Sequence, residues 1–136
     1  MQEVKGDLRP LRGLMKWLGT DWAFLMTDIT QGAAGNSERM AFLFDRRRVE
    51  PSGLACELVV PEEWLEEIAP DALRRQFART PYAVSFRSAT ETFIPVTLHI
   101  TYGSEAAERA PELRGISRWI RECADRTNAW SQNLIA

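Results

Sequence analysis

The spacing of apolar residues near the start of the chain predicts a helix. Apolar side chains recur there at helical intervals and form one buried stripe, made of Leu8, Leu11, Leu14, Met15, Trp17 and Leu18. Asp7 can cap this helix, and Pro10 fits its first turn, where the missing N–H has no intrahelical partner. Gly19 is expected to end the helix.

Later apolar runs predict strands, at residues 22–27, 38–44, 54–60, 82–87 and 92–103. The second of these runs is apolar over most of its length, which indicates a strand that is covered on both faces. Residues 88–91 turn the fourth run back into the fifth, so we expect a hairpin there. The fifth run carries His99, the only histidine of the protein, and stops at a Tyr-Gly turn.

The last third of the chain predicts a long helix and one more strand. Its buried stripe, flanked by Trp119, is expected to consist of Leu113, Ile116, Ile120 and Cys123. We place Pro111 in the first turn of this helix, and residues 133–136 at the start of a buried strand. The secondary structure of residues 61–76 is ambiguous, because Pro70 interrupts apolar residues at helical spacing. This order of elements predicts an α+β fold in which a mixed, mostly antiparallel sheet packs against helices.

The composition is that of an ordinary globular domain. The chain of 136 residues, 45% hydrophobic and 26% charged, is long enough for one domain with its own core. Its formal net charge of −2 gives no overall affinity for nucleic acid, so any such affinity has to come from local basic patches. The sequence has no secretory signal or long apolar span, and Cys56 and Cys123 lack metal-ligand spacing. We interpret both cysteines as buried thiols of a reducing compartment, which favours the cytoplasm.

Two features that resemble nucleic-acid interfaces have plainer interpretations. The arginines at residues 46–48 are typical of a solvated charge cluster in a turn. The tryptophans fit buried stripes better than a platform on which bases stack. With acidic residues elsewhere along the chain, the surface is predicted to be mixed in charge rather than basic.

Four short patches together resemble the endonuclease/exonuclease/phosphatase superfamily, the metal-dependent phosphoesterases that include the pancreatic-type deoxyribonucleases. The patches are Gln-Glu-Val at residues 2–4, Ser-Glu-Arg at 37–39, Phe-Ala-Arg-Thr-Pro-Tyr at 77–82, and Thr-Leu-His with a following Tyr-Gly at 97–103. Their order, separation and strand contexts carry the resemblance almost from end to end. It implies a single partial domain over residues 1–136, an α/β sandwich that copies part of the four-layer DNase I-like fold.

The resemblance implies a metal ligand and a catalytic pair. Glu3 matches the family's glutamate that binds a divalent cation, Mg²⁺ or Mn²⁺, and a carboxylate is the ligand type that such hard cations take. His99 matches a catalytic histidine that acts on the phosphate, oriented by a carboxylate on a neighbouring strand, here Glu38. A carboxylate beside an imidazole fixes its tautomer and stabilises its charged form, which suits a general base or a cation beside phosphoryl oxygens.

Three further positions are implied as contacts of the substrate phosphate. Arg79 precedes a proline-aromatic pair as in the family, and its guanidinium fork can bond two phosphate oxygens. Lys5 follows the Gln-Glu-Val motif, and Asn36 lies in a loop that the family points at its active site.

Each of these positions also has a plainer interpretation. Glu3 can be a solvated terminal residue, and Glu38 the surface partner of Arg39 in a salt bridge. Arg79 can be an exposed loop residue and His99 a core histidine bonded to backbone.

The resemblance covers only the first half of a family domain and leaves the activity open. The Gly-Asp-Phe-Asn and Asp-His motifs of the family have no counterpart, so we expect a fragment of a Mg-dependent phosphodiesterase, truncated at both ends and inactive or nearly so alone. Its substrate would be nucleic acid or another phosphodiester, and open sheet edges would favour self-association. The alternatives are a non-catalytic remnant or interaction module with the same half-fold, and an unrelated α+β binding domain.

Overall fold

The computed structural model describes residues 1–29, 37–59, 61, 77, 79–100, 105–125 and 133–136. The elements in chain order are β1 (Val4–Lys5), α1 (Arg9–Leu18), β2 (Trp22–Met26), β3 (Glu38–Arg39), β4 (Ala41–Asp45), β5 (Glu50–Glu57), β6 (Tyr82–Ser88), β7 (Glu91–Thr97), α3 (Ala106–Asp125) and β8 (Leu134–Ile135). The α+β class predicted from the sequence is confirmed. No helix within the described ranges is long and apolar enough to cross a membrane.

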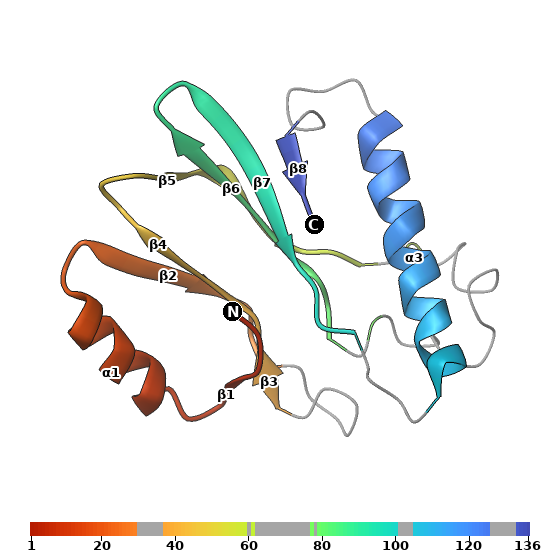
Figure 1. Cartoon of the computed structure of the whole chain (residues 1–136), viewed down its shortest axis with the longest axis horizontal. Helices are drawn as coiled ribbons and strands as arrows, with labels where there is room; N and C mark the ends of the chain where they lie inside the picture. The colour runs from red at the N-terminus through yellow and green to blue at the C-terminus, as the bar shows by residue number, and fades with distance from the viewer. Residues whose placement is uncertain (30–36, 60, 62–76, 78, 101–104, 126–132) are drawn as a thin grey trace.

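The described elements form layers, with α1 on one side, α3 on the other and two sheets between them (Figure 1). The first of these sheets pairs β2 with β4 antiparallel, and the second has the order β5-β6-β7-β8; β1 and β3 form a separate short antiparallel pair. An aromatic cluster fills the space between the sheets, and separate apolar clusters join each sheet to its helix. These layers arise because both sheets carry apolar residues on both faces.

Strand β4 shows how the pattern of the sequence produces two buried faces. Phe42 and Phe44 pack into the aromatic cluster toward the second sheet. Ala41 and Leu43 alternate with them and pack toward α1. The prediction that this strand is covered on both faces is therefore confirmed, although the strand begins one residue after a break at Met40 that separates it from β3.

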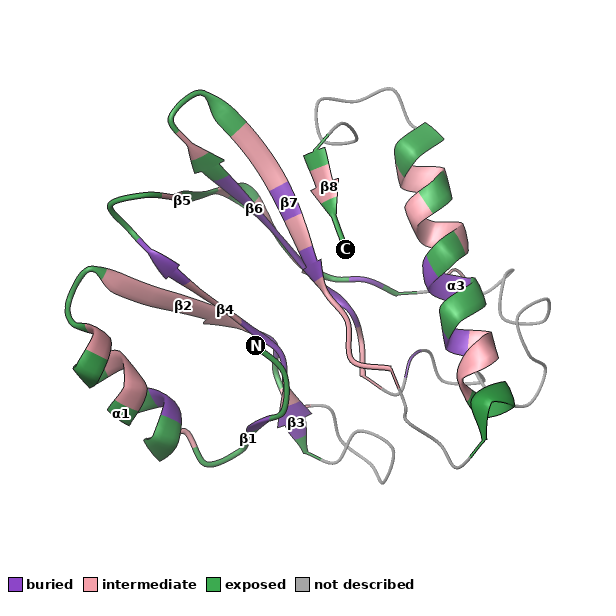
Figure 2. Cartoon of the chain, viewed as in Figure 1, coloured by how far each residue is buried: buried purple, intermediate pink, exposed green. Residues whose placement is uncertain are grey.

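The second sheet is centred on the β6–β7 hairpin, which confirms the predicted hairpin. The strands pair antiparallel up to Ser88 opposite Glu91, and Ala89 takes a left-handed φ of 52° in the turn. Along β6, Tyr82, Val84 and Phe86 face the aromatic cluster, whereas Ala83 faces the side of α3. Figure 2 shows the resulting buried residues of β6 and the mostly half-buried residues of β7 beside them. Strand β8 pairs parallel with β7, so the strand predicted at the end of the sequence is confirmed, but it is not buried as expected: Leu134 is half-buried and Ile135 is 56% exposed.

Helix α1 keeps its predicted end but not all of its predicted stripe. Gly19 has φ 94° and donates its N–H to the Met15 carbonyl, so the glycine stop is confirmed. Leu8 is the N-cap residue, and Asp7 accepts the Arg9 N–H at 3.0 Å from one position before the cap. The assignment of Trp17 to the buried stripe is wrong: its side chain is 83% exposed.

Other boundaries differ from the sequence-based prediction. Strand β5 begins four residues earlier than expected and ends at Glu57. Helix α3 begins at Ala106, so Pro111 lies inside it rather than in its first turn. Leu113 is 46% exposed because the buried side of α3 is centred on Glu112 and Ile116. The ambiguous residues 62–76 lie outside the described part of the chain. Cys56 and Cys123 are half-buried and form no disulfide.

The turn after β4 confirms the interpretation of residues 46–48 as a charge cluster. Asp45 accepts the Arg47 N–H at 2.9 Å and its guanidinium at 2.8 Å. These bonds from Arg47 lower the pKa of Asp45 from 3.8 to about 2. Arg47 also approaches Asp21 at 3.2 Å, and Arg46 donates to the Thr20 carbonyl. The turn thereby ties the end of β4 to the start of β2.

Truncation of the aromatic cluster is expected to destabilise the fold. Phe86 is 2% exposed and contacts Phe44 at a ring-centroid distance of 5.0 Å. We expect Phe86→Ala to lower the free energy of unfolding by about 3–5 kcal/mol. Trp17→Ala, which truncates an exposed aromatic residue, should stay within about 0.5 kcal/mol of the parent. Urea denaturation of the three proteins measures both effects, and equal losses would contradict this description of the core.

The charged turn predicts a pH-dependent contribution to stability. The folded-state pKa of Asp45, about 2, lies below its ordinary value of 3.8, so its ionised form stabilises the fold above the ordinary value. That contribution disappears as the pH falls through the folded value. Asp45→Asn should therefore be less stable than the parent near neutrality, and the difference should shrink in acid. Thermal denaturation across a pH series measures it, with the more exposed Asp21→Asn as a control expected to differ less; a difference independent of pH would refute the assignment.

Candidate active site

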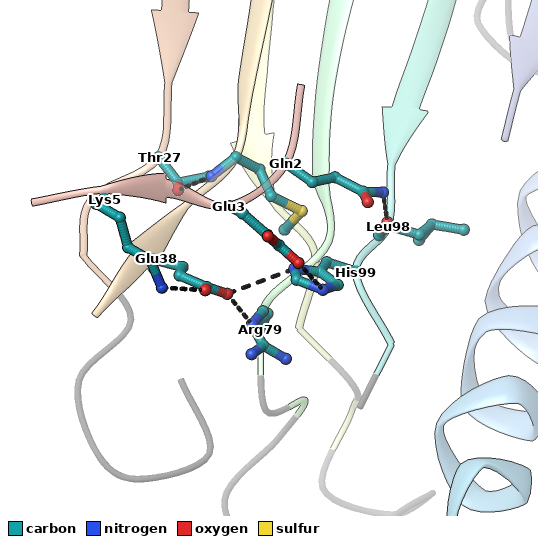
Figure 3. Close-up of polar contacts among 9 residues, drawn as sticks. Gln2, Glu3, Lys5, Thr27, Glu38, Arg79, Leu98 and His99 are labelled. Atoms are coloured by element: carbon teal, nitrogen blue, oxygen red, sulfur yellow. Dashed lines mark hydrogen bonds and ion pairs between the residues drawn. The ribbon is translucent and has the colours of Figure 1, made fainter. Parts of the chain in front are cut away.

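Five of the six site residues predicted from the sequence lie together where β1 and β3 pair and the chain leaves β7 (Figure 3). They are Glu3, Lys5, Glu38, Arg79 and His99. The sixth, Asn36, lies outside the described residues. Because these residues come from four separate segments, the fold rather than local sequence brings their charges together.

The Glu38 carboxylate is the centre of the cluster, with a side chain that is only 4% exposed. Strand register places Lys5 directly opposite Glu38, and the Lys5 Nζ lies 2.5 Å from Glu38 Oε1. Arg79 Nε lies 2.8 Å from the other carboxylate oxygen. The hydrogen bond from Lys5 lowers the pKa of Glu38, Arg79 adds to this effect, and burial opposes it. Glu38 is therefore a buried anion rather than the predicted alternative, a surface partner of Arg39, which instead donates to the Gly6 carbonyl at 3.4 Å.

Of the two cations, Arg79 is the better shielded from water. Its side chain is 13% exposed, whereas that of Lys5 is 56% exposed. The shorter contact of Lys5 dominates the pKa of Glu38, but water screens an exposed ammonium more strongly, so we regard the Arg79 pair as the more important for stability. Arg79 contacts Glu38 through Nε, and its two terminal nitrogens point away from the carboxylate in Figure 3. The guanidinium is thus held through Nε, and its two terminal nitrogens take no part in this contact.

His99 lies between two carboxylates, two residues beyond the end of β7. Its Nδ1 is 3.6 Å from Glu38 Oε2, and its Nε2 is 3.6 Å from Glu3 Oε1. Both separations exceed hydrogen-bond length, and the buried Nδ1 has no hydrogen-bond partner among the described residues. The expectation that Glu38 and His99 lie on neighbouring strands is wrong: β3 pairs with β1 and not with β7, and His99 follows the end of β7 rather than lying in it.

Glu3 owes its position to a β-bulge. Met1 exchanges two backbone hydrogen bonds with Ala41, of 2.8 and 2.9 Å, while β1 pairs with β3 one residue out of step with that register. Gln2 and Glu3 together therefore lie opposite Met40 alone. Glu3 adopts a left-handed φ of 58°, which is uncommon for a residue with a side chain. Its carboxylate, 65% exposed, is the one on the open side of the imidazole.

Two residues that sequence reasoning did not single out support this geometry. The Gln2 side-chain amide donates to the carbonyl of Leu98, the residue before His99, and so ties the N-terminal segment to the histidine loop. Thr27 extends the pairing of β2 with its partner: its N–H donates to the Met40 carbonyl at 2.9 Å, and its hydroxyl accepts the Met40 N–H at 3.1 Å. The only signal of these roles in the sequence is the amide beside Glu3.

The donor set fits a cation that needs few protein ligands. The described residues contain no group of three or more histidine, cysteine, aspartate or glutamate side chains arranged around a metal position. Glu3 offers one exposed carboxylate, whereas Glu38 is occupied by Lys5 and Arg79. Mg²⁺ commonly binds through one or two carboxylates and retains several waters, so Glu3 is a suitable first ligand for it.

Comparison with known proteins relates most of the chain to part of a longer one. No protein-family model matches the chain. Over 109 residues, 79% of its length, the chain is 30% identical to a protein named deoxyribonuclease from Thioalkalivibrio sp. (strain K90mix). The matched region spans 27% of that protein, about a quarter of its length.

The buried carboxylate predicts a pH-dependent loss of stability on its neutralisation. Glu38→Gln removes the partner of Arg79 and should lower the free energy of unfolding by roughly 2–3 kcal/mol near neutrality. Because folding lowers the pKa of Glu38, its contribution is present above the ordinary value of 4.5 and is lost as the pH falls through the folded value. The gap between variant and parent should therefore close in acid.

A matched control for this measurement is Glu50→Gln. Glu50 also pairs with an arginine, Arg87, but the two side chains are 59% and 55% exposed. We expect a change of about 0–1 kcal/mol there. Equal effects of the two substitutions on urea denaturation would show that the Glu38 cluster is an ordinary surface ion pair.

Proposed function

We propose that this chain supplies part of the active site of a metal-dependent phosphodiesterase, a nuclease of the endonuclease/exonuclease/phosphatase type. The observation that carries the proposal is the convergence of Glu3, Glu38, Arg79 and His99 from segments that are distant in the sequence. The similarity to a protein named deoxyribonuclease supports it independently. Phosphodiester cleavage needs a hard-cation ligand, cationic groups for phosphate and a proton-handling group, and this set contains each of them.

The cations of the site would bind and orient the phosphate. Arg79 is fixed to Glu38 through Nε, which leaves its terminal nitrogens to bond two phosphoryl oxygens in the bidentate manner of guanidinium. Lys5, more exposed, would add a positive charge at the rim. A divalent cation held by Glu3 would supply further neutralisation of phosphate charge when bound. Glu38 keeps Arg79 in place and prevents the guanidinium from turning away from substrate.

His99 would handle the proton. The anionic carboxylate of Glu38 faces Nδ1 and favours the tautomer with its proton there. That tautomer leaves Nε2, on the open side toward Glu3, with the lone pair that can accept a proton from an attacking water. Hydrogen bonds of this kind are often long before substrate binds and shorten in the complex. General base catalysis of this type contributes a rate factor of about 10²–10⁴.

Turnover by the chain alone is expected to be slow or undetectable. Two motifs that the resemblance associates with catalysis have no counterpart among the 136 residues. Groups that act as a unit lose most of the rate when members are missing. Binding at the site is therefore the sharper test than cleavage.

The single histidine makes metal binding at this site directly observable. We expect substoichiometric Mn²⁺ to broaden the imidazole proton resonances of His99, because Nε2 lies 3.6 Å from the Glu3 carboxylate that would hold the cation. Glu3→Gln should remove the broadening. Glu91→Gln, at the exposed turn between β6 and β7, is the matched control and should leave it intact.

The alternative of a non-catalytic module predicts another result in the same experiment. Imidazole resonances that are unaffected by Mn²⁺ in the parent, or broadened equally in Glu3→Gln, would overturn the proposal. Addition of a short thymidine dinucleotide with Mg²⁺ should shift the same resonances in the parent, and Arg79→Gln should weaken that shift.

A further inference from the structure

Helix α1 presents an outward face whose chemistry the proposed site does not use. We propose that this face binds a strand of nucleic acid, with cationic side chains on the phosphates and Trp17 stacked on a base. The inference rests on the proposed function only for the identity of the polyanion, since the residues involved lie outside the cluster around Glu38.

The cations of α1 form one row. Arg9, Arg12 and Lys16 fall within a sector of about 60° around the helix axis and span roughly 10 Å along it. The helix contains no acidic residue. Arg9 shares its charge with Asp7 at 2.8 Å, whereas Arg12 and Lys16 are exposed and have no ion pair with a described residue. In a chain of net charge −2, this row is a local concentration of positive charge.

Trp17 lies on the other edge of the same outward face, and its 83% exposure leaves its ring free to contact a partner. Tryptophan is ordinarily well buried, so an exposed one next to a cationic row needs a reason. Phosphate-binding cations combined with an aromatic ring are the two components of single-stranded nucleic-acid sites. The sequence assigned this residue to the core, and only its exposure reveals the arrangement.

Gly13 supplies an independent observation on this face. It occupies the interior of the helix, where glycine is less favourable than alanine, and a Cβ at this position would meet nothing within 4 Å. Packing within the protein therefore does not require glycine there. By helical geometry Gly13 lies between the cationic row and Trp17, one turn before the tryptophan, whose side chain leans back toward it. The missing side chain leaves room for a planar base against the Trp17 ring.

The opposite face of α1 argues against an anionic membrane as the partner. A helix that lies in a membrane interface needs its apolar face free to enter the lipid. In α1 that face is occupied, because Leu11 is 5% exposed and packs with Met15 against the first sheet. Figure 2 shows the exposed residues on the outer side of the helix. Nucleic acid needs only that outer side.

The position of α1 connects this face to the candidate site. The helix begins four residues after Lys5, which contacts Glu38. Figure 1 shows α1 following β1 directly along the outside of the first sheet. A strand bound along Arg9, Arg12 and Lys16 would therefore approach the site from the side of Lys5.

Binding of a fluorescein-labelled oligothymidylate, followed by anisotropy in EDTA over a series of NaCl concentrations, tests the inference. Arg12→Gln combined with Lys16→Gln should weaken binding and reduce the slope of log affinity against log salt by about 1.4. Trp17→Ala should weaken binding roughly 5- to 100-fold. The matched control, Arg114→Gln combined with Arg121→Gln, removes the same charge from α3 and should leave the slope unchanged.

Gly13→Ala separates a binding role from a structural one. Alanine favours the helix, so this variant should have a higher melting temperature and yet a lower affinity for the oligonucleotide. Unchanged affinity in the α1 variants, losses equal to those of the α3 control, or binding to phosphatidylglycerol vesicles without binding to the oligonucleotide would each overturn the inference. Because the assay contains no divalent metal, its result is independent of the Mn²⁺ experiment on His99: either can fail while the other succeeds.

Discussion

The arrangement of the candidate site depends on the neutralisation of one carboxylate that has been withdrawn from water. An isolated buried carboxylate is strongly unfavourable, and Glu38 is stable in that position because Lys5 and Arg79 approach its two oxygens from opposite segments. This requirement ties β1, β3 and the loop before β6 to a single point. The same carboxylate lies 3.6 Å from His99 Nδ1, so the group that ties these segments together is also the one that faces the imidazole. The fold of this region and the proposed chemistry therefore both depend on the Glu38 carboxylate.

The ion pair with Glu38 also affects how Arg79 would bind a phosphate. As a loop arginine it would lose conformational freedom on meeting a phosphate, which would weaken binding. Fixed through Nε, it is oriented before any ligand arrives. Arginine suits this double duty because its planar fork offers donors on more than one edge, whereas the ammonium of a lysine is a single point of charge. For the proposed phosphate-binding role, an arginine would therefore be more useful at this position than a lysine.

The sequence predicted the parts of the molecule that depend on local pattern. The stop at Gly19, the hairpin at Ala89 and the doubly covered β4 follow from one residue's conformation or from strand alternation. The exposure of Trp17 could not be predicted, because helical spacing alone does not fix how wide a buried stripe is. The approach of Glu38 to His99 was inferred from resemblance, yet the placement of Glu38 in the β1-β3 pair and of His99 beyond β7 was not, since strand pairing is a property of the whole fold. The bulge at Glu3 could not be predicted, because no pattern in the sequence indicates it.

That bulge has a consequence for how the chain tolerates length changes. Side chains alternate between the faces of a strand, and the extra residue opposite Met40 resets this alternation just before β1. Removing a single residue there would restore regular pleating, abolish the left-handed conformation of Glu3 and so redirect its carboxylate. The substitution of any one side chain in the segment is a smaller perturbation than this shift. Engineering of the N-terminal segment should therefore keep the number of residues opposite Met40 unchanged, because this number matters more than the identity of any one of them.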